Sequence, residues 1–305
     1  MKTKNNKLKG QNLLRHEKIE SLLVNEGQLI SGSVGLLHIL KLLFSSRKEN
    51  FYFHFLEMYD FCLVSLFSEY RYRFESGSLS LTSPLGFAYN LAKVLFFRVL
   101  IRDSDIIILS SEMRIKYAKK RGFKNEFFCI KNKPLYSHDI EIKEPRQEKI
   151  VLIGNLNQRD DFLKVVQFAI DSGLEISCYG ISAKDQQWLK TYHFDNVKCI
   201  DKVSSDDIPR LLYTSKYSIC LYSNSSINQR FSASSKLFES LYFGCIPIVS
   251  NNRGVLREME EYRIDFLNVS NLSDASNMNV SDRVVLDLKY VFDFELNKLK
   301  ARLHK

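Results

Sequence analysis

A serine-rich loop, a helix and a buried strand follow one another between Ser234 and Ser250, and their residue types suit a phosphorylated ligand. Ser234 and Ser235 precede the expected helix, Lys236 lies in its first turn and Gly244 ends it. The first N–H groups of a helix lack intrahelical partners and carry partial positive charge, so this end attracts phosphate. A lysine there opposes the helix dipole unless an anion lies nearby, which favours a ligand-binding role for Lys236.

Glu239 lies one turn further along this helix and can accept two hydrogen bonds from a ribose diol. With phosphates at the helix start and a ribose at Glu239, the segment has the groups to hold a nucleoside diphosphate. An ordinary βα unit whose Glu239 is a surface charge fits the same pattern, and the pattern alone leaves both interpretations open. Arg230, in the preceding loop, is a further candidate cation.

Composition limits the class of protein and of partner. The chain has 305 residues, of which 45% are hydrophobic, and a formal charge of +9. This length predicts two domains with enough residues to bury two cores. A basic balance suits nucleic acid, an anionic membrane surface or a phosphorylated ligand. No RGG tract, zinc knuckle or basic-aromatic alternation occurs, so nucleic acid is not expected as a partner.

Several common chemistries lack their motifs in this sequence. The six cysteines form no CxxC pair and are expected to be buried, reduced thiols. No HExxH or Cys/His ligand spacing predicts a metal, and GxSxG, GxGxxG and P-loop patterns are absent. The first residues carry no apolar signal segment, and no apolar run approaches the roughly 20 residues of a membrane helix. A cytoplasmic location is therefore expected.

The order of the expected elements predicts an α/β protein in two parts. From residue 150 to residue 249, apolar strands alternate with helices, which indicates a parallel sheet covered on both faces. The predicted organisation is a first domain at 1–135, a charged linker at 136–148, a second domain at 149–280, and a terminal helix within 281–305 that returns toward the first domain.

Ligands of parallel α/β sheets bind at the carboxyl ends of the strands. In the second domain this rule selects 154–159, 179–180, Val203, 222–236 and 250–251. Within these ranges the residues expected to bind the ligand are Gly154, Asn155, Tyr179, Val203, Ser234 and Ser235. Arg159 follows the first of these strands and suits bidentate binding of a diphosphate, although a solvated arginine at a helix start is an equal interpretation.

Two segments of the first domain carry further signals in the sequence. Residues 68–84 are polar and then rich in serine, and we expect a loop that closes over a ligand. The apolar helix expected at 85–101 fits core packing better than membrane contact.

Five pieces of the chain resemble GT-B glycosyltransferases of the large retaining group, family 4. The most specific piece is Ser234–Val249, which is similar to the family pattern "P.KlfEylaaG.PvV". The resemblance covers roughly half of the chain, and its other pieces are Asp105–Glu112, Phe128–Pro134, Ile150–Arg159 and Asn196–Leu212.

The resemblance implies two Rossmann-like domains facing a cleft and a hexosyltransferase that uses a nucleotide-sugar donor as substrate, without a cofactor. By position, Lys236 and Arg159 would bind the diphosphate as the catalytic cations, and Glu239 would bind the ribose. The resemblance also implies a retaining, metal-independent reaction on a glycan or lipid-linked acceptor in surface polysaccharide synthesis. Such an enzyme would work in the cytoplasm, at the inner membrane face as a peripheral protein.

The chain departs from the family pattern in two places. Phe231 stands where many members carry an acid, eight residues before the helix glutamate. A subgroup of the family whose motif ends in "NK.fEy" also lacks this acid, and by resemblance to that subgroup Asn228 or Arg230 would bind the donor instead. The first helix begins near residue 13, so the first strand and its glycine-rich loop are expected to be missing from a small first domain.

Two alternatives to a transferase follow from these residues. A catalytically degenerate GT-B homologue would bind a nucleotide or a partner protein without chemistry. A GT-B sugar epimerase would need paired carboxylates and a histidine near the cleft, and these are not found.

Overall fold

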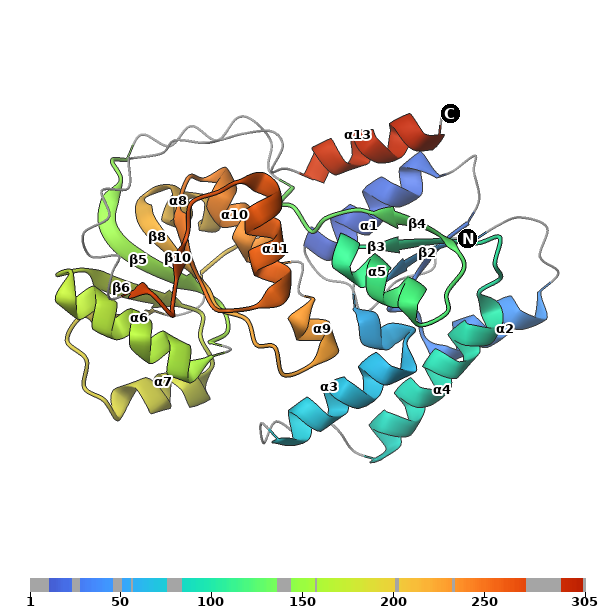
Figure 1. The fold of residues 1–305 in the computed structure, drawn as a ribbon, viewed down its shortest axis with the longest axis horizontal. Helices are drawn as coiled ribbons and strands as arrows, with labels where there is room; N and C mark the ends of the chain where they lie inside the picture. The colour runs from blue at the N-terminus through green and yellow to red at the C-terminus, as the bar shows by residue number, and fades with distance from the viewer. Residues whose placement is uncertain are drawn as a thin grey trace. The chain divides into compact units, whose positions relative to one another are not determined.

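The computed structural model describes residues 11–23, 28–45, 51–55, 57–75, 84–135, 144–156, 158–200, 203–231, 234–272 and 292–303. The chain divides into two compact α/β units (Figure 1). Unit 1 comprises Met1–Leu135, Ser225–Ala233 and Phe292–Lys305, and unit 2 comprises Tyr136–Asn224 and Ser234–Val291. Residues 136–143 of the predicted linker and 273–291 of the predicted second domain and terminal helix lie outside the described residues.

Unit 1 contains a parallel sheet whose strands follow the chain order β1-β2-β3-β4. Its elements are α1 (Gln11–Leu22), β1 (Gln28–Ser31), α2 (Leu36–Phe44), β2 (Phe51–Phe55), η1 (Met58–Asp60), α3 (Leu63–Glu75), α4 (Pro84–Leu100), β3 (Ile106–Leu109), α5 (Glu112–Lys120), β4 (Glu126–Cys129), α9 (Ile227–Arg230) and α13 (Phe292–Leu303).

Side chains of alternate residues divide the sheet of unit 1 between two cores. Phe51, Phe53 and Phe55 of β2 face a core closed by α2, α4 and α5, whereas Tyr52 faces the opposite side. That second core is closed by α1 and α13, which lie side by side in Figure 1. The C-terminal helix is therefore an integral layer of unit 1.

The polar segment that the sequence analysis assigned to a loop at 68–84 is in part a helix. α3 continues to Glu75, and residues 76–83 lie outside the described part of the chain. Ser68 and Glu69 face inward because they bond to Ile227 and Ser226, far along the sequence. The prediction of a loop over residues 68–75 was wrong because those partners are invisible in the local sequence.

Unit 2 contains a parallel sheet in the order β10-β9-β8-β5-β6-β7. Its elements are β5 (Gln147–Ile153), α6 (Arg159–Asp171), β6 (Glu175–Tyr179), α7 (Ala183–Lys190), β7 (Val197–Ile200), α8 (Ile208–Tyr213), β8 (Ser215–Cys220), α10 (Ser235–Tyr242), β9 (Ile246–Val249), α11 (Arg253–Tyr262) and β10 (Leu267–Asn268). The alternating strands and helices predicted for this part are confirmed.

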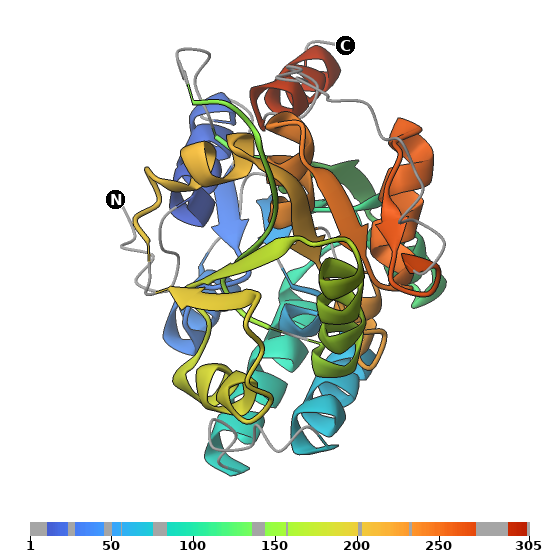
Figure 2. The ribbon, with the colours of Figure 1, turned by 90° about the vertical axis from the view of Figure 1, so that its left-hand side faces the viewer.

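Helices cover both faces of this sheet, as the apolar strands require. α6 covers one face, where Phe162 and Val165 join a core with residues of β5, β6, β8 and β9 (Figure 2). α8, α10 and α11 cover the other face, where Phe238 and Met259 lie in a separate core.

The strand order of unit 2 reverses at β5. The chain builds β6 and β7 on one side of β5 and then returns to build β8, β9 and β10 on its other side. Loops that leave neighbouring strands in opposite directions open a crevice at the carboxyl ends of those strands, and ligands bind there. The described sheet of unit 1 has no such reversal. A candidate ligand site of unit 2 is therefore expected after β5 and β8.

The strand order of unit 1 bears on the expectation of a missing first strand. Residues 1–10, where a strand before α1 would have to lie, are outside the described residues. The structure does contain β1, followed by the glycine-containing loop Gly32–Gly35 that leads into α2.

Candidate functional site

Lys236 and Gly154 meet at the strand-order reversal of unit 2. A Cβ added to Gly154 would lie 3.4 Å from Nζ of Lys236, so the ammonium lies against the backbone that follows β5. Gly154 has a φ of +79°, in the left-handed region that favours glycine. The backbone conformation therefore favours glycine at this position, and a Cβ there would be in contact with the Lys236 ammonium.

The Lys236 ammonium has no hydrogen bond or ion pair with any side chain or carbonyl in the described ranges. Burial lowers the pKa of Lys236, and the nearby Cys220 and Glu239 offset part of that effect. A cation removed from water without a partner is costly, and an anionic ligand would relieve that cost. An anionic ligand next to Lys236 would therefore stabilise the charged form of this lysine.

The N-terminus of α10 is arranged to present N–H groups. Ser234 is the N-cap: its hydroxyl accepts a 3.1 Å hydrogen bond from the N–H of Leu237 and donates a 2.6 Å bond to the Tyr222 hydroxyl. The Ser234 hydroxyl is thus occupied within the protein. The N–H groups of Ser235 and Lys236 lie in the first turn, where helix geometry provides no acceptor, and remain for an anion.

Tyr222 and Asn155 complete this corner of unit 2. Together with Lys236 they line a hollow of about 10 Å³, which is room for one water molecule. A diphosphate is larger than this hollow, so it would lie outside it, along the N-terminus of α10. Tyr222 follows β8 and opens the range 222–236 that the strand-end rule selects from the sequence.

Glu239 lies three residues after Lys236 on α10, and its side chain is half-buried. Residues three apart share a helix face, and the Glu239 charge acts on the Lys236 ammonium. Lys236 and Glu239 therefore share one face of α10, and their roles toward a phosphate and a ribose stay predictions.

Arg159, the second predicted cation, already has a partner. Its guanidinium forms a 2.8 Å ion pair with Asp185 and lies over the Trp188 ring, 4.9 Å from the ring centre. Asp185 also accepts a hydrogen bond from Ser182, the N-cap of α7. Arg159 does not line the hollow beside Lys236. Its role as a phosphate cation stays a prediction.

Tyr179 and Val203 contribute as framework. The Tyr179 carbonyl accepts a 2.7 Å hydrogen bond from the N–H of Gly154, which fixes the turn after β5. The Tyr179 ring is buried in the core beneath α10, and Val203 packs against the same core.

Asn228 and Arg230 lie in unit 1 rather than with Lys236 in unit 2. Asn228 Oδ1 accepts a 3.0 Å hydrogen bond from the N–H of Met58, and Arg230 is exposed at the end of α9. Their role toward a ligand stays a prediction, and their contacts in unit 1 were not foreseen.

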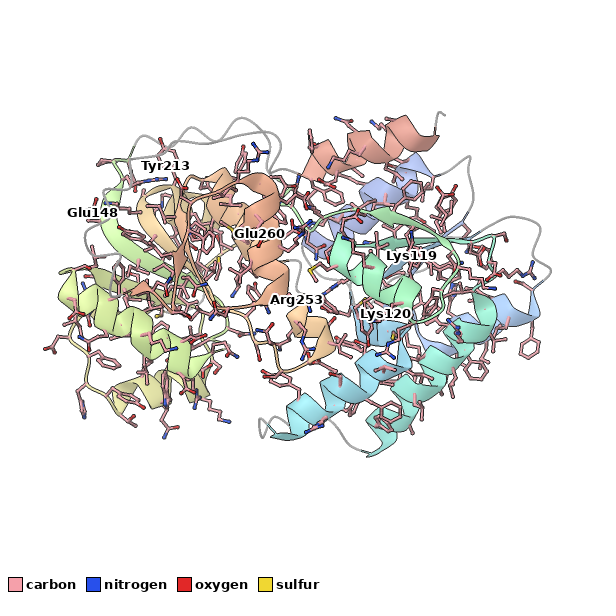
Figure 3. The ribbon with its side chains drawn as sticks, in the orientation of Figure 1. Lys119, Lys120, Glu148, Tyr213, Arg253 and Glu260 are labelled. Carbon is pink, nitrogen blue, oxygen red and sulfur yellow. The ribbon has the colours of Figure 1, made fainter. Side chains whose placement is uncertain are left out.

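Two further groups of polar residues lie at strand ends. In unit 2, Asn252 caps α11, and the exposed Arg253 begins that helix, with Glu260 further along it (Figure 3). In unit 1, the buried Lys93 ammonium pairs with Asp60 at 3.2 Å and bonds to the Gly32 carbonyl. The group around Lys93 could have been found in the sequence, because a lysine inside the otherwise apolar sequence of α4 needs a polar partner.

Comparison with known proteins gives similarity in fold alone. No protein-family model matches the chain, and no curated protein matches its sequence. The structure of S. aureus TarM in complex with fondaparinux, alpha-GlcNAc-glycerol and UDP superposes with a TM-score of 0.54 and 13% identity, over 87% of this chain. Anabaena HepE in complex with UDP-glucose superposes with a TM-score of 0.54 and 10% identity, over 94% of this chain.

The chain spans 53% of the length of TarM and 81% of that of HepE. These similarities establish the fold: two α/β units with parallel sheets, of the GT-B type found in glycosyltransferases. The predicted fold class is confirmed.

The described residues contain neither a metal-binding group nor a membrane-spanning helix. Among the residues that the structure describes, no group of three or more His, Cys, Asp and Glu side chains is arranged to hold a metal ion. No helix in the described part of the chain combines the length and apolar character needed to cross a bilayer.

Proposed function

We propose that this protein is a glycosyltransferase of the hexosyltransferase type, similar to family 4, that takes a sugar from a nucleotide-diphosphate donor. The observation that carries the proposal is the half-buried Lys236, whose ammonium has no hydrogen bond or ion pair with the described residues and lies next to Gly154 and the first turn of α10. It lies where the strand order reverses, the position at which α/β sheets bind ligands.

Departure of a nucleoside diphosphate leaves negative charge on the phosphate oxygens. Lys236 and the N–H groups of α10 would stabilise this charge, and fixed cations and dipoles of this kind supply much of the rate enhancement in such reactions. With them in place, the transfer needs no divalent cation, so we propose a metal-independent reaction. Glu239 would accept hydrogen bonds from the ribose, and the anomeric configuration would be retained, as in family 4.

The two superposed proteins support a uridine nucleotide as the first donor to test. The TarM complex contains UDP and the HepE complex contains UDP-glucose. We propose the same donor class here, with a glycan or a lipid-linked glycan as acceptor, in the synthesis of a surface polysaccharide.

A location at an anionic membrane surface, on the cytoplasmic side, is part of this proposal. Leu37 and Phe44 of α2 are 77% and 87% exposed, and Val99 of α4 is 72% exposed. The sequences of α2 and α4 contain no acidic residue, and Lys41 is exposed between Leu37 and Phe44. An apolar face with basic residues suits the headgroup region of anionic lipids.

A nucleotide-binding homologue without catalysis is the second candidate function. Phe231, at the position of the acid found in many family members, is buried and packs against Tyr117. The chain therefore has no carboxylate at position 231. Any contact with the donor sugar that the acid makes in those family members has no counterpart at this position.

Thermal shift and calorimetric titration with UDP, UDP-glucose and UDP-GlcNAc test the site. A ligand at about 100 times its Kd stabilises the protein by about 2.7 kcal/mol. We expect Lys236→Met to abolish the shift and Lys164→Ala, an exposed lysine of α6, to retain it. The absence of a shift with every nucleotide sugar would refute donor binding. Binding without sugar transfer to any glycan or lipid-linked acceptor would favour the second candidate.

A further inference from the structure

Cys178 and Cys199 lie side by side on neighbouring strands of unit 2. In the parallel register of β6 and β7, Cys178 is the Cα partner of Cys199. Such partners are about 4.8 Å apart, the spacing of adjacent strands, and their side chains point to the same face of the sheet. Cα atoms joined by a disulfide are usually about 4.4–6.8 Å apart. The register therefore places the two thiols within reach of a disulfide bond.

The packing of the neighbouring residues agrees with a shared face. Cys178 lies with Ile176 in the core beneath α6, and Val197 of β7 packs against the same core. Cys199 comes two residues after Val197, so its side chain points to that face, whereas Ile200 packs against the opposite core. Burial raises the pKa of Cys178, and the charge of the nearby Cys199 raises it further. The two sulfur atoms are therefore close neighbours.

The two thiols differ in their access to solvent. Cys178 is 0% exposed, whereas Cys199 is exposed on β7, the last strand at this edge of the sheet. All six cysteines lie in the described ranges, and Cys199 is the only exposed one among them, so the expectation of buried thiols was wrong at this position. A reagent in solution therefore reaches Cys199 and not Cys178.

A hollow beside Cys199 has the size and charge to receive a small anionic molecule. Pockets that hold small molecules measure about 300 to 1,000 Å³. Burial raises the pKa of Cys199, and the exposed Lys190 ammonium offsets part of that effect. A carboxylate of a bound molecule would therefore find a cation close to the thiol. The hollow measures about 380 Å³ and is lined by Leu189, Lys190, His193, Phe194, Val197 and Cys199.

We propose that Cys199 is a site of thiol–disulfide exchange with a small anionic disulfide of the glutathione disulfide type, and that Cys178 completes the exchange by forming a cross-strand disulfide with Cys199. Cys199 reacts first because it alone of the two is accessible. The inference goes beyond the proposed function, since no nucleotide or sugar takes part in it.

The exchange has two steps. The Cys199 thiol loses its proton and attacks one sulfur of the reagent R–S–S–R, so that a bond from Cys199 to S–R forms and RS⁻ leaves and takes up a proton. Cys178 then loses its proton and attacks the sulfur of Cys199. The bond between the two cysteines forms, and the second RS⁻ leaves and takes up a proton. Two protein thiols are oxidised, and one R–S–S–R is reduced to two R–SH.

The cross-strand bond would close residues 179–198, which contain α7, into a covalent loop. A disulfide restricts the unfolded chain and thereby stabilises the folded one. The bond would tie the edge strand β7 to β6, whose residues lie in the core. Oxidising conditions would therefore stabilise this edge of unit 2, and a reducing agent would reverse the effect.

Glutathione disulfide tests the proposal on the full chain, with intact-mass measurement and non-reducing peptide mapping. We expect the wild type to lose the mass of two hydrogen atoms, to yield a linked Cys178–Cys199 peptide, and to unfold at a temperature several degrees higher until a reducing agent is added. Cys178→Ser should stop after the first step, with one glutathione on Cys199. Cys199→Ser should react at neither position. Cys129→Ser, which removes a half-buried thiol of unit 1, is the matched control and should react like the wild type.

Charge reversal at the hollow tests the choice of an anionic reagent. Lys190→Glu should slow the first step severalfold with glutathione disulfide and speed it with cystamine, a cationic disulfide. Unchanged rates with both reagents would overturn the preference for an anionic disulfide.

Peptide mapping of the wild type decides the remaining points, even if Cys178→Ser at its buried position fails to fold. A wild type that stays reduced in glutathione disulfide would overturn the exchange site. Glutathione that remains on Cys199, with no bond to Cys178, would overturn the resolving role of Cys178. Linked peptides that contain Cys62, Cys220 or Cys245 would show reaction of an unfolded chain and would overturn the proposal as well.

Discussion

Gly154 and Lys236 lie against each other although they come from separate elements, the end of β5 and the start of α10. The glycine lets the backbone turn in the left-handed region, and the same missing side chain leaves room for the ammonium. Gly154 therefore combines a local requirement, the positive φ, with a long-range contact to Lys236. A comparison of two glycines can separate these two effects.

Gly154→Ala should weaken nucleotide binding, whereas Gly173→Ala should not. Both glycines have positive φ, +79° and +66°, so alanine strains each backbone by about 1–2 kcal/mol. A Cβ at Gly154 meets Lys236 at 3.4 Å, but a Cβ at Gly173 meets nothing within 4 Å. Thermal unfolding should show similar losses for the two variants, and UDP titration should show a loss of affinity for Gly154→Ala alone. Equal affinities would mean that this approach does not shape the site.

Nucleotide affinity should fall at alkaline pH because of Lys236. Burial lowers the pKa of this lysine from its ordinary value of 10.5, whereas a bound diphosphate favours the charged form. UDP affinity should thus be full below the lowered pKa and should decline as the pH rises through it. Calorimetric titration between about pH 7 and pH 10 should show the decline in the wild type and a low, flat profile in Lys236→Met.

The same group affects stability with the opposite sign. Between the lowered folded pKa and 10.5, the unfolded chain binds more protons than the folded one at this position. The contribution of Lys236 to the free energy of unfolding should therefore rise with pH across that window and be unfavourable below it. Denaturant unfolding of the wild type and of Lys236→Met, compared across the window, measures the difference. A difference that shrinks toward low pH would contradict the lowered pKa.

Arg159 offers a test of whether a paired arginine also serves the ligand. If Arg159 binds phosphate, Asp185 competes with the ligand for the guanidinium, because the two form a 2.8 Å ion pair. Arg159→Ala should then weaken UDP binding less than Lys236→Met does, and Asp185→Asn should strengthen it slightly. Calorimetric titration of the three variants measures these effects. Unchanged affinity in both Arg159→Ala and Asp185→Asn would restrict Arg159 to joining α6 and α7.

The sequence predicted unit 2 well because its signals are local. Strand and helix periods alternate from β5 to β9. The strand-end rule selects Gly154, Asn155 and Lys236 from the sequence, and these three residues lie together in the structure. The sequence failed at residues 68–75, where polar side chains on α3 looked like a loop. Glu69 is buried because Ser226, from another part of the chain, donates to it, and no local pattern carries that information.

The exposed apolar residues of α2 should mediate binding to anionic vesicles. Leu37→Ser combined with Phe44→Ser removes two side chains that are 77% and 87% exposed, so folding should be little affected. Co-sedimentation with vesicles of phosphatidylglycerol and phosphatidylcholine should show weaker binding of the double variant and little binding to neutral vesicles. Ile170→Ser, a half-exposed position on α6, is the control and should bind like the wild type. Equal binding of the double variant would place the contact elsewhere.

Lys133 and Glu295 form the ion pair that anchors α13 to unit 1. The two charged groups lie 2.6 Å apart, and their side chains are 0% and 1% exposed. Glu295 also accepts from the N–H of Lys131, and the Lys133 carbonyl accepts from Arg15 of α1. Burial lowers the pKa of Lys133, and Glu295 offsets part of that effect.

Breaking this pair on one side should cost more than removing it. Lys133→Met leaves the buried Glu295 carboxylate with only the half-exposed Lys298 ammonium, 3.3 Å away, as a cation, so the loss should lie at the low end of the about 3–5 kcal/mol typical of a broken buried pair. The double variant Lys133→Met with Glu295→Gln leaves no buried charge and should recover most of that loss. Denaturant unfolding of the two single variants and the double variant gives the coupling energy directly. Additive losses would show that α13 is held by its apolar contacts, among them Phe292 and Leu296, rather than by the pair.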